Sequence, residues 1–279
     1  MLTQNQLKEL FSIYNFSPLK RLGENYLIDG NIKDKIISEA YIGKGDTVLE
    51  IGPGFGALTI DLASSGAKVF AVEKDKKAFS ILKELIRDDY PNLKLFNDDI
   101  LEFDLKIISG KKRIKVIGLL PYYITTPIIE YLIKNGHLID SILIVMQREV
   151  ADRLLAQPGL KDRGSISCFV QYYTKPRYIY TIKRGSFYPA PEVDSSLVRL
   201  VILDKPSVSV KNEELFFKII RGSFNQKRKS IINSLSRKEV LAVTKKELAD
   251  IFSKAGVDPH SRPEDMPLQS FAKISNELS

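Results

Sequence analysis

The chain has few of the residues that hold disulfides or metals. Its 279 residues include one cysteine, Cys168, and two histidines, His137 and His260. A single cysteine excludes an internal disulfide framework and a metal site built from clustered cysteines. Two histidines give little basis for a zinc site, so we expect a protein without a bound metal.

A long apolar segment is also missing. The longest uncharged run, residues 116–129, is too short to span a bilayer and is broken by Pro121 and Pro127. The N-terminal sequence MLTQNQLKELFSIYN has polar and acidic residues where a signal peptide would have an apolar block. We therefore expect a cytoplasmic protein that does not enter a membrane.

The residues that are present have the balance of a globular protein with a cationic excess. Apolar residues make up 44% of the chain and charged residues 27%, as is typical of soluble globular proteins. The length suggests two domains. The 42 Lys and Arg against 34 Asp and Glu give a formal charge of +8, which favours an anionic partner.

Short apolar runs alternate with helical patterns through the first two thirds of the chain. We predict helices such as 75–88, and strands at 47–51, 68–73, 93–97, 114–118 and 141–146. Three of these runs contain the nearly continuous apolar stretches VLEI, VFAV and ILIVM, which predict a parallel sheet covered by helices on both faces. Two later runs, 177–182 and 196–203, have a spacing that suits an antiparallel addition to the sheet edge.

The pattern changes near residue 204. From residue 213 onward the periodicity is mostly helical, and Pro206 lies close to the change. We therefore predict an α/β domain over residues 1–204 and a smaller helical domain over residues 205–279.

A glycine-rich loop follows the first predicted strand. Gly52, Gly54 and Gly56 lie between that strand and an apolar helix, where glycines let the backbone approach a ligand closely. Read as G-x-G-x-x-A, the loop could bind a nicotinamide cofactor. Read as E-x-G-x-G, with Glu50 at the strand end, it is the loop of a class I S-adenosylmethionine-dependent methyltransferase. A tight turn needed only for packing is the third interpretation.

Acidic residues end the next two predicted strands. Glu73, about 20 residues after the loop, can accept both ribose hydroxyls, as either cofactor would require. Asp99 can accept from an adenine amino group, although it could also cap a turn. The three loops converge at the carboxyl edge of the predicted sheet, where open α/β sheets bind ligands.

Eight segments carry a resemblance to a known family. From about residue 20 to 278 the chain resembles the KsgA-type adenine dimethyltransferases, which act on small-subunit ribosomal RNA. The segments are LGENYLID (22–29), VLEIGPGFGALT (48–59), NDDIL (97–101), LLPYYITTPII (119–129), VMQREVADRLLAQPG (145–159), SFYPAPEVDSSLVRL (186–200), SFNQKRKSIINSL (223–235) and VDPHSRPEDMPLQSFAKIS (257–275). A nicotinamide enzyme would have no reason to carry the last four of these segments.

The resemblance implies a fold, a reaction and a cofactor. The fold is α/β, a Rossmann-like class I methyltransferase with a mostly parallel sheet and a small C-terminal helical domain. The reaction is N6,N6-dimethylation of adenines in 16S ribosomal RNA, on the pre-30S particle, by a monomer that uses S-adenosyl-L-methionine. Six residues would bind this cofactor: Asn25 and Leu27 at the methionine end, Gly52 and Gly54 beneath it, Glu73 at the ribose and Asp99 at the adenine amino group.

The motif after the fourth predicted strand departs from the family pattern. By resemblance, Tyr122 and Phe187 would sandwich the target base. The family has Asn-Leu-Pro-Tyr here, and this chain has Leu119 in the place of Asn. The family's Asn carbonyl accepts a hydrogen bond from the target amine, so its loss should cost about 10²–10³ in rate. A second, milder departure is Glu24, where the family usually has Gln.

Position 119 leaves an alternative open. A chain that keeps the fold and binds RNA without turnover would be a ribosome assembly factor and not an enzyme. The large-subunit adenine methyltransferases of antibiotic resistance share the core motifs, but the match in the C-terminal segments argues against them. We take the dimethyltransferase as the leading interpretation.

The cationic excess is concentrated in one segment. Residues 205–238 contain nine Lys and Arg and two Asp and Glu, a local net charge of +7. Such a segment is often only a solvated helix face. Next to a methyltransferase domain, contact with RNA phosphates is the better interpretation. The residues predicted to make it are Arg221, Lys227, Arg228 and Lys229.

Overall fold

The computed structural model describes residues 2–18, 25–87, 89–226, 229–237, 241 and 243–279. The chain divides into two compact units. Unit 1 contains Met1–Ala151 and Arg177–Ile202, and unit 2 contains Asp152–Pro176 and Leu203–Ser279. No described helix is both long enough and apolar enough to cross a membrane.

The division places one more segment in the C-terminal unit than the predicted boundary near residue 204 does. Residues 152–176 belong to unit 2 because their apolar side chains pack in its core. Tyr172 is 2% exposed there, and its hydroxyl donates to Glu213 at 3.0 Å. A helical segment gives no sign in the sequence of which core it will join.

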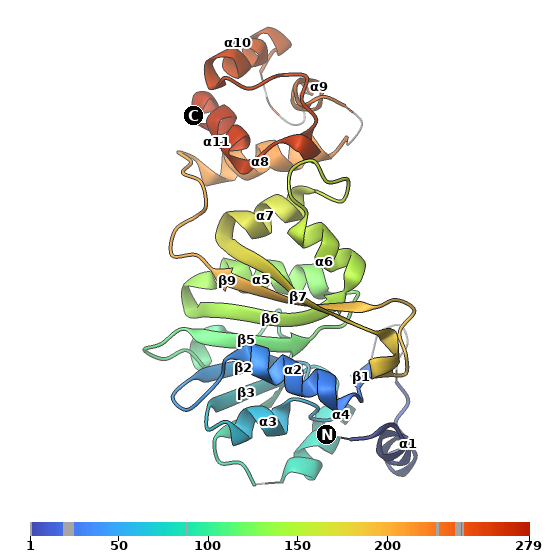
Figure 1. Ribbon diagram of the computed structural model, residues 1–279. Helices are drawn as coiled ribbons and strands as arrows, with labels where there is room; N and C mark the ends of the chain where they lie inside the picture. Colours follow the sequence, from blue (N-terminus) through green and yellow to red (C-terminus); the bar gives the residue numbers. More distant parts are fainter. Residues whose placement is uncertain (1, 19–24, 88, 227–228, 238–240, 242) are drawn as a thin grey trace. The chain divides into compact units, whose positions relative to one another are not determined.

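Unit 1 is built on a seven-stranded sheet with the strand order β4-β3-β2-β5-β6-β9-β7 (Figure 1). The first five strands in this order pair in parallel, and β9 pairs antiparallel with β6. This confirms the predicted mostly parallel sheet with its antiparallel addition. The strands are β2 (Thr47–Ile51), β3 (Lys68–Glu73), β4 (Leu93–Asn97), β5 (Ile114–Leu119), β6 (Ile139–Gln147), β7 (Thr174–Ile182) and β9 (Ser195–Ile202).

Helices cover both faces of the sheet, as Figure 1 shows. The helix α4 illustrates why they form. Its buried residues, Ala78, Ile81, Leu82 and Ile86, follow a helical stripe, and the side chain of Asp75 caps its N-terminus by accepting from the Ala78 amide at 2.6 Å. The helices of this part of the chain are α1 (Gln4–Ile13), α2 (Gly30–Ala40), α3 (Thr59–Ser64), α4 (Lys76–Ile86), α5 (Thr125–Lys134) and α6 (Arg148–Leu155).

A second, two-stranded sheet joins the N-terminal segment to the segment before β9. Strands β1 (Tyr26–Leu27) and β8 (Phe187–Tyr188) pair antiparallel, with Leu27 opposite Phe187. The Ile28 amide extends the pairing by donating to the Ser186 carbonyl at 2.9 Å. Two segments about 160 residues apart in the sequence therefore meet beside the main sheet.

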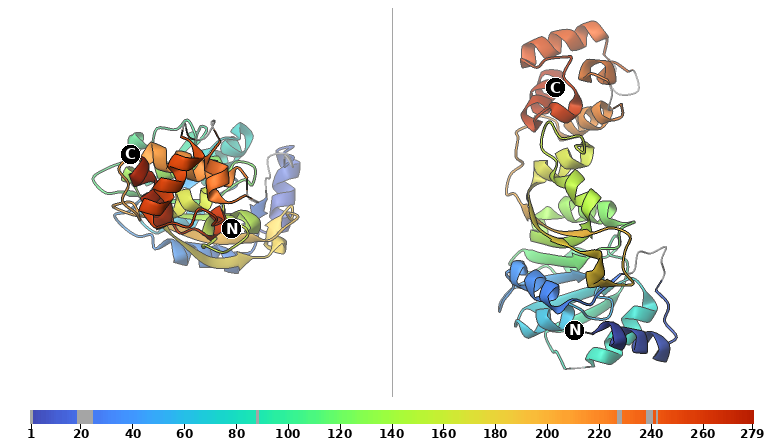
Figure 2. Two further views of the ribbon diagram at one scale, coloured as in Figure 1. Left: turned by 90° about the horizontal axis from the view of Figure 1, so that it is seen from above. Right: turned by 45° about the vertical axis from the view of Figure 1, so that its right-hand side comes forward.

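Helix α1 lies at the N-terminal end of unit 1 (Figure 2) and is joined to the rest of the unit by aromatic contacts. The Phe11 ring packs at 5.6 Å from Phe55 in the glycine-rich loop and at 5.8 Å from Tyr26. Leu7 of the same helix is 2% exposed in this cluster. Burying these rings offsets the cost of ordering the N-terminal helix.

Unit 2 has a helical core. Phe216, Phe252 and Phe271, from three different helices, are fully buried in it. The buried Arg163 guanidinium donates to the carbonyl oxygens of Ala156 and Met266, at 3.2 and 3.1 Å, and so ties the first segment of the unit to the last. The helices are α7 (Ser165–Tyr173), α8 (Glu213–Phe224), α9 (Ile231–Leu235), α10 (Lys245–Ala255) and α11 (Leu268–Leu278).

Candidate active site

A cavity of about 480 Å³ lies in unit 1 at the carboxyl ends of β2, β3 and β5. This is the edge at which open α/β sheets bind ligands, and the volume is in the range of small-molecule sites. The cavity brings together eight of the nine unit 1 residues that the sequence predicts to act. They are Asn25, Leu27, Gly52, Gly54, Glu73, Leu119, Tyr122 and Phe187.

The glycine-rich loop forms one wall of the cavity. Gly52 and Gly54 have φ angles of 66° and 55°, in the left-handed region that favours glycine. A Cβ atom on Gly54 would lie 3.0 Å from the ring of Tyr26. Both the backbone conformation and the close neighbour therefore require glycine at position 54.

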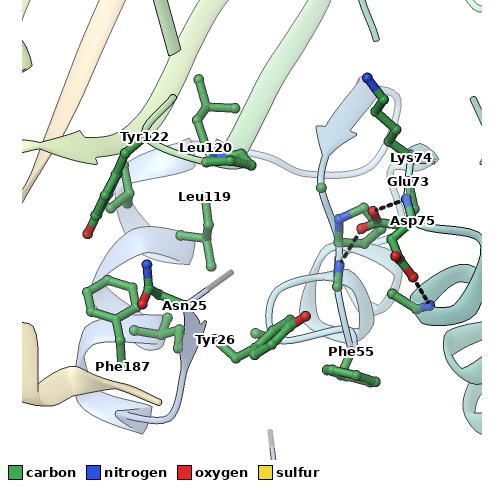
Figure 3. A pocket seen from close by; sticks show the side chains of 18 of the residues that line it. Asn25, Tyr26, Phe55, Glu73, Lys74, Asp75, Leu119, Leu120, Tyr122 and Phe187 are labelled. Carbon is green, nitrogen blue, oxygen red and sulfur yellow. Dashed lines mark hydrogen bonds between the residues drawn. The ribbon is translucent and has the colours of Figure 1, made fainter. Parts of the chain in front are cut away.

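Glu73 connects this loop to the next one. Its carboxylate accepts from the Gly54 amide at 3.0 Å and from the Asp75 amide at 2.9 Å (Figure 3). Asp75 in turn caps α4. The carboxylate is thus held at a defined place on the cavity wall by the backbone of two loops.

A second carboxyl lies close by in the protein interior. Glu50, at the end of β2, is 2% exposed, and no hydrogen-bond partner for its Oε2 atom is found among the described residues. Burial raises the pKa of Glu50 to about 8, with a further increase from the nearby Glu73 and a decrease from the Thr59 hydroxyl. Glu50 is therefore mainly neutral at pH 7.

Asp99 lies just outside the cavity lining, unlike the other predicted residues of unit 1. Its carboxylate pairs with the Lys74 ammonium at 2.6 Å, and Lys74 lines the cavity. Burial alone would raise the pKa of Asp99, but Lys74 and the Leu101 amide outweigh it and the pKa is lowered. Asp99 is thus an ionised side chain next to the cavity.

Leu119 ends β5 on the floor of the cavity. It pairs with Val145 of β6, and its side chain packs on the apolar cluster that contains Leu27, Val145 and Phe187. A Cβ atom on Gly52 would lie 3.9 Å from the Leu119 carbonyl oxygen, so this backbone acceptor is close to the glycine-rich loop. At this point the cavity has a backbone acceptor and an apolar side chain.

Tyr122 and Phe187 lie on the side of the cavity away from Glu73 and Phe55, with Leu119 between the two sides in the view of Figure 3. Phe187 is 4% exposed and belongs to the apolar core. The Tyr122 hydroxyl lies 2.8 Å from the Ser195 hydroxyl oxygen. Burial raises the pKa of Tyr122, against a smaller lowering by Ser195, so its hydroxyl stays neutral.

Part of the predicted basic contact lies in unit 2. Arg221, on α8, and Lys229 are exposed. Lys227 and Arg228 lie outside the described residues. In the described part of the chain no group of three or more His, Cys, Asp or Glu side chains is arranged to hold a metal ion.

Comparison with known proteins decides the family. Residues 15–279 match the family described as "Ribosomal RNA adenine dimethylase". The chain belongs to this family. It is 40% identical over 276 residues to a protein of Alkaliphilus oremlandii named ribosomal RNA small subunit methyltransferase A, covering 98% of this chain and 96% of that one. A protein of Bacillus mycoides with the same name is 40% identical over 282 residues, covering 99% and 96%.

Solved structures agree with the family assignment. A dimethyladenosine transferase from Plasmodium falciparum superposes with a TM-score of 0.78 at 27% identity, covering 89% of this chain and 95% of that one. The 23S rRNA methyltransferase ErmE superposes with a TM-score of 0.70 at 23% identity, covering 91% and 99%, which supports the fold alone. The predicted resemblance and the class I methyltransferase fold are confirmed.

The cavity also contains residues that the sequence analysis missed. The Tyr26 ring packs at 4.8 Å from the ring of Phe55 in the glycine-rich loop, and the Ser195 hydroxyl bonds with the Tyr122 hydroxyl. Leu7 lines the cavity from α1. The capping box of Thr3 and Gln6 at the start of α1 is a sequence signal from which this helix could have been predicted. No local pattern marks Ser195, because its partner lies 73 residues away.

Proposed function

We propose that this family member transfers methyl groups from S-adenosylmethionine to the N6 atom of adenines in small-subunit ribosomal RNA, two to each adenine. One observation carries the proposal. A single cavity joins the glycine-rich loop and Glu73 on one side to Tyr122 and Phe187 on the other, with the end of β5 between them. A nucleoside cofactor and a flat base can therefore meet inside one site.

The first side of the cavity fits the cofactor. Gly52 and Gly54 place no side chain on the cavity wall that they form, and Glu73 occupies the strand end at which an acidic side chain accepts ribose hydroxyls. We assign Asn25 and Leu27 to the methionine end, Gly52 and Gly54 to the space beneath it, and Glu73 to the ribose. We assign Asp99 to the adenine end of the cofactor. It acts there through its ion pair with Lys74, which lines the cavity.

The other side of the cavity fits an adenine base. When bound, the cofactor supplies an electrophilic sulfonium methyl group. The adenine amine is a weak nucleophile because its lone pair is delocalised into the ring, so the chain must hold the amine in line with that methyl group. Tyr122 and Phe187 provide ring faces for stacking, and the base reaches them from an RNA loop or by leaving its stack.

The residues at the end of β5 accept hydrogen bonds from the amine. The backbone carbonyl groups of Leu119 and Leu120 serve as acceptors, which directs the nitrogen lone pair toward the methyl group. The Leu119 side chain adds no acceptor, so we expect turnover about 10²–10³ lower than with Asn at this position. The methylated ammonium is strongly acidic, so its proton is lost without a strong base.

Arg221 and Lys229 of unit 2 contact the RNA backbone in this proposal, together with Lys227 and Arg228. Such contacts hold RNA without reading its sequence. The physiological substrate is the small-subunit precursor particle, which the chain meets as a monomer in the cytoplasm.

Labelled-methyl transfer tests the proposal. Small ribosomal subunits that lack the modification are incubated with the chain and labelled S-adenosylmethionine under single-turnover conditions, with large subunits as the control. We expect dimethyladenosine in small-subunit ribosomal RNA alone. Label in the large subunit, or binding to small subunits with no transfer on any timescale, contradicts the proposed function.

A further inference from the structure

The two rings that face the target base are held in different ways. Phe187 is fixed by packing, since it is 4% exposed in an apolar cluster and lies opposite Leu27 in the β1–β8 pair. Tyr122 lies in the turn between β5 and α5 and is only partly buried. Packing alone therefore leaves the Tyr122 ring less constrained than the Phe187 ring.

A hydroxyl pair supplies the missing constraint. The Tyr122 hydroxyl lies 2.8 Å from the Ser195 hydroxyl oxygen, and either group can donate. The torsion that orients a tyrosine ring has broad, shallow minima. The phenol oxygen lies on the axis of this torsion, so the bond holds the far end of the ring in place. It also restricts rotation of the ring, because a phenol hydroxyl bonds best in the plane of its ring. The base of the turn is held as well, because Thr125 donates to the Pro121 carbonyl at 3.0 Å.

Ser195 is a rigid point of attachment. It is the first residue of β9, lies opposite Gln147 in the antiparallel pair with β6, and has no exposed surface. It also lines the cavity. A buried hydroxyl on a strand that is paired on both sides can keep its position when a ligand enters, which a side chain on the turn itself could not.

We infer that Ser195 is a positioning residue for methyl transfer, which sets the plane of the Tyr122 ring and thereby the alignment of the target amine. The inference rests on the proposed function. It assigns Ser195 no contact with the reacting atoms. Its effect should fall on the rate of the chemical step, because a small misplacement of a bound reactant lowers the rate without weakening binding in proportion.

Ser196 provides a matched control for Ser195. It is adjacent, has no exposed surface, and its Oγ atom has no hydrogen-bond partner among the described residues. In a strand it points to the opposite face from Ser195. Removing either hydroxyl makes the same chemical change in the same strand, but only one of them is bonded to Tyr122.

The test is a double-mutant cycle in methyl transfer. In the Leu119→Asn background we expect Ser195→Ala and Tyr122→Phe each to lower kcat about tenfold. The double variant should also be about tenfold slower, since either change breaks the same bond. Ser196→Ala should match the parent, and all variants should keep the parent's affinities for S-adenosylmethionine and for small subunits.

The outcomes separate this inference from the proposed function. A parent that transfers no methyl group overturns the proposed function, and the inference with it. A parent that transfers, together with Ser195→Ala at the parental rate, overturns only the inference. A hundredfold loss in the double variant, or an equal loss in Ser196→Ala, also overturns it, because either would show independent or merely structural effects. Thermal unfolding of each variant checks that the fold is retained.

Discussion

The two sides of the cavity differ in chemistry although they are built on neighbouring strands of one sheet. On the cofactor side, Glu73 accepts from the amides of Gly54 and Asp75, and these polar groups are fixed by backbone bonds. On the base side, Leu119 packs on an apolar cluster, and its side chain offers no acceptor. We therefore expect cofactor binding and the chemistry on the base to be separable in this chain, so that each can be altered without the other.

The largest expected effect is a gain on the base side. Leu119→Asn places an amide carbonyl at the end of β5, where it can accept from the target amine. We expect kcat for methyl transfer to rise about 10²–10³, while the Kd for S-adenosylmethionine stays the same. Single-turnover kinetics and calorimetric titration measure the two quantities.

Leu119→Ala is the matched control for this variant. It disturbs the same packing against the apolar cluster and adds no acceptor, so it should not raise kcat. If Leu119→Asn is no faster than the parent chain, then the acceptor role assigned to this position is wrong and the contrast between the two sides has a different origin.

The next effect is a loss on the cofactor side. Glu73→Ala removes the carboxylate that joins the two loops and that we assign to the ribose. Hydrogen bonds to a charged group contribute about 1.5–3 kcal/mol, so the Kd for S-adenosylmethionine should rise about 10- to 100-fold. Glu73→Gln keeps the side-chain length and one oxygen, so its Kd for S-adenosylmethionine should lie between those of the parent chain and Glu73→Ala. An unchanged Kd in Glu73→Ala would remove this residue from the cofactor site.

A third experiment concerns the buried carboxyl beneath the loop. The pKa of Glu50 is about 8 in the folded chain against a reference value of 4.5, so the folded state binds its proton more tightly than the unfolded state does. This contribution to stability is complete below pH 4.5 and is lost as the pH rises through 8. The loss amounts to a few kcal/mol at most.

Glu50→Gln should abolish this dependence because glutamine does not titrate. Denaturant unfolding at pH 6 and pH 9 should show a smaller loss of unfolding free energy in the variant than in the parent. Equal losses would mean that Glu50 is ionised in the folded chain, and that the cofactor side is more polar beneath the loop than its burial indicates.

The main strands of the sheet were the elements best predicted from the sequence. The runs at 47–51, 68–73 and 93–97 form β2, β3 and β4 at those same residues, because each is a short run rich in apolar residues between turn-forming segments. The two-residue strands β1 and β8 were not predicted. They are too short for any periodicity and exist only because distant segments pair.

The same distinction holds for the candidate site. Glu73 could be placed from the sequence because the strand ends of a parallel sheet meet at one edge, and Leu119 from the resemblance of the motif after the fourth predicted strand. Ser195 could not be singled out, since its place depends on a tertiary contact with Tyr122. Asp99 lies two residues after the end of β4 and pairs with Lys74, which strand position alone does not indicate.

The smallest expected effect lies in the other unit and tests whether RNA binding is independent of both sides of the cavity. Arg221 and Lys229 are exposed cations outside the cavity lining. Replacing both with Ala should weaken binding to small subunits and reduce the slope of log K against log salt by about 1 to 1.5, because each phosphate contact on a single strand contributes about 0.7. Lys254→Ala removes an exposed cation of the same unit outside the basic segment and should leave the slope unchanged.

The Kd for S-adenosylmethionine and the rate of single-turnover transfer at saturating RNA should not change in any of these variants, since none of the replaced residues lines the cavity. A lower rate at saturation would mean that the basic segment also sets how the base enters the cavity, so that the division of labour between cofactor side, base side and RNA contact would have to be redrawn.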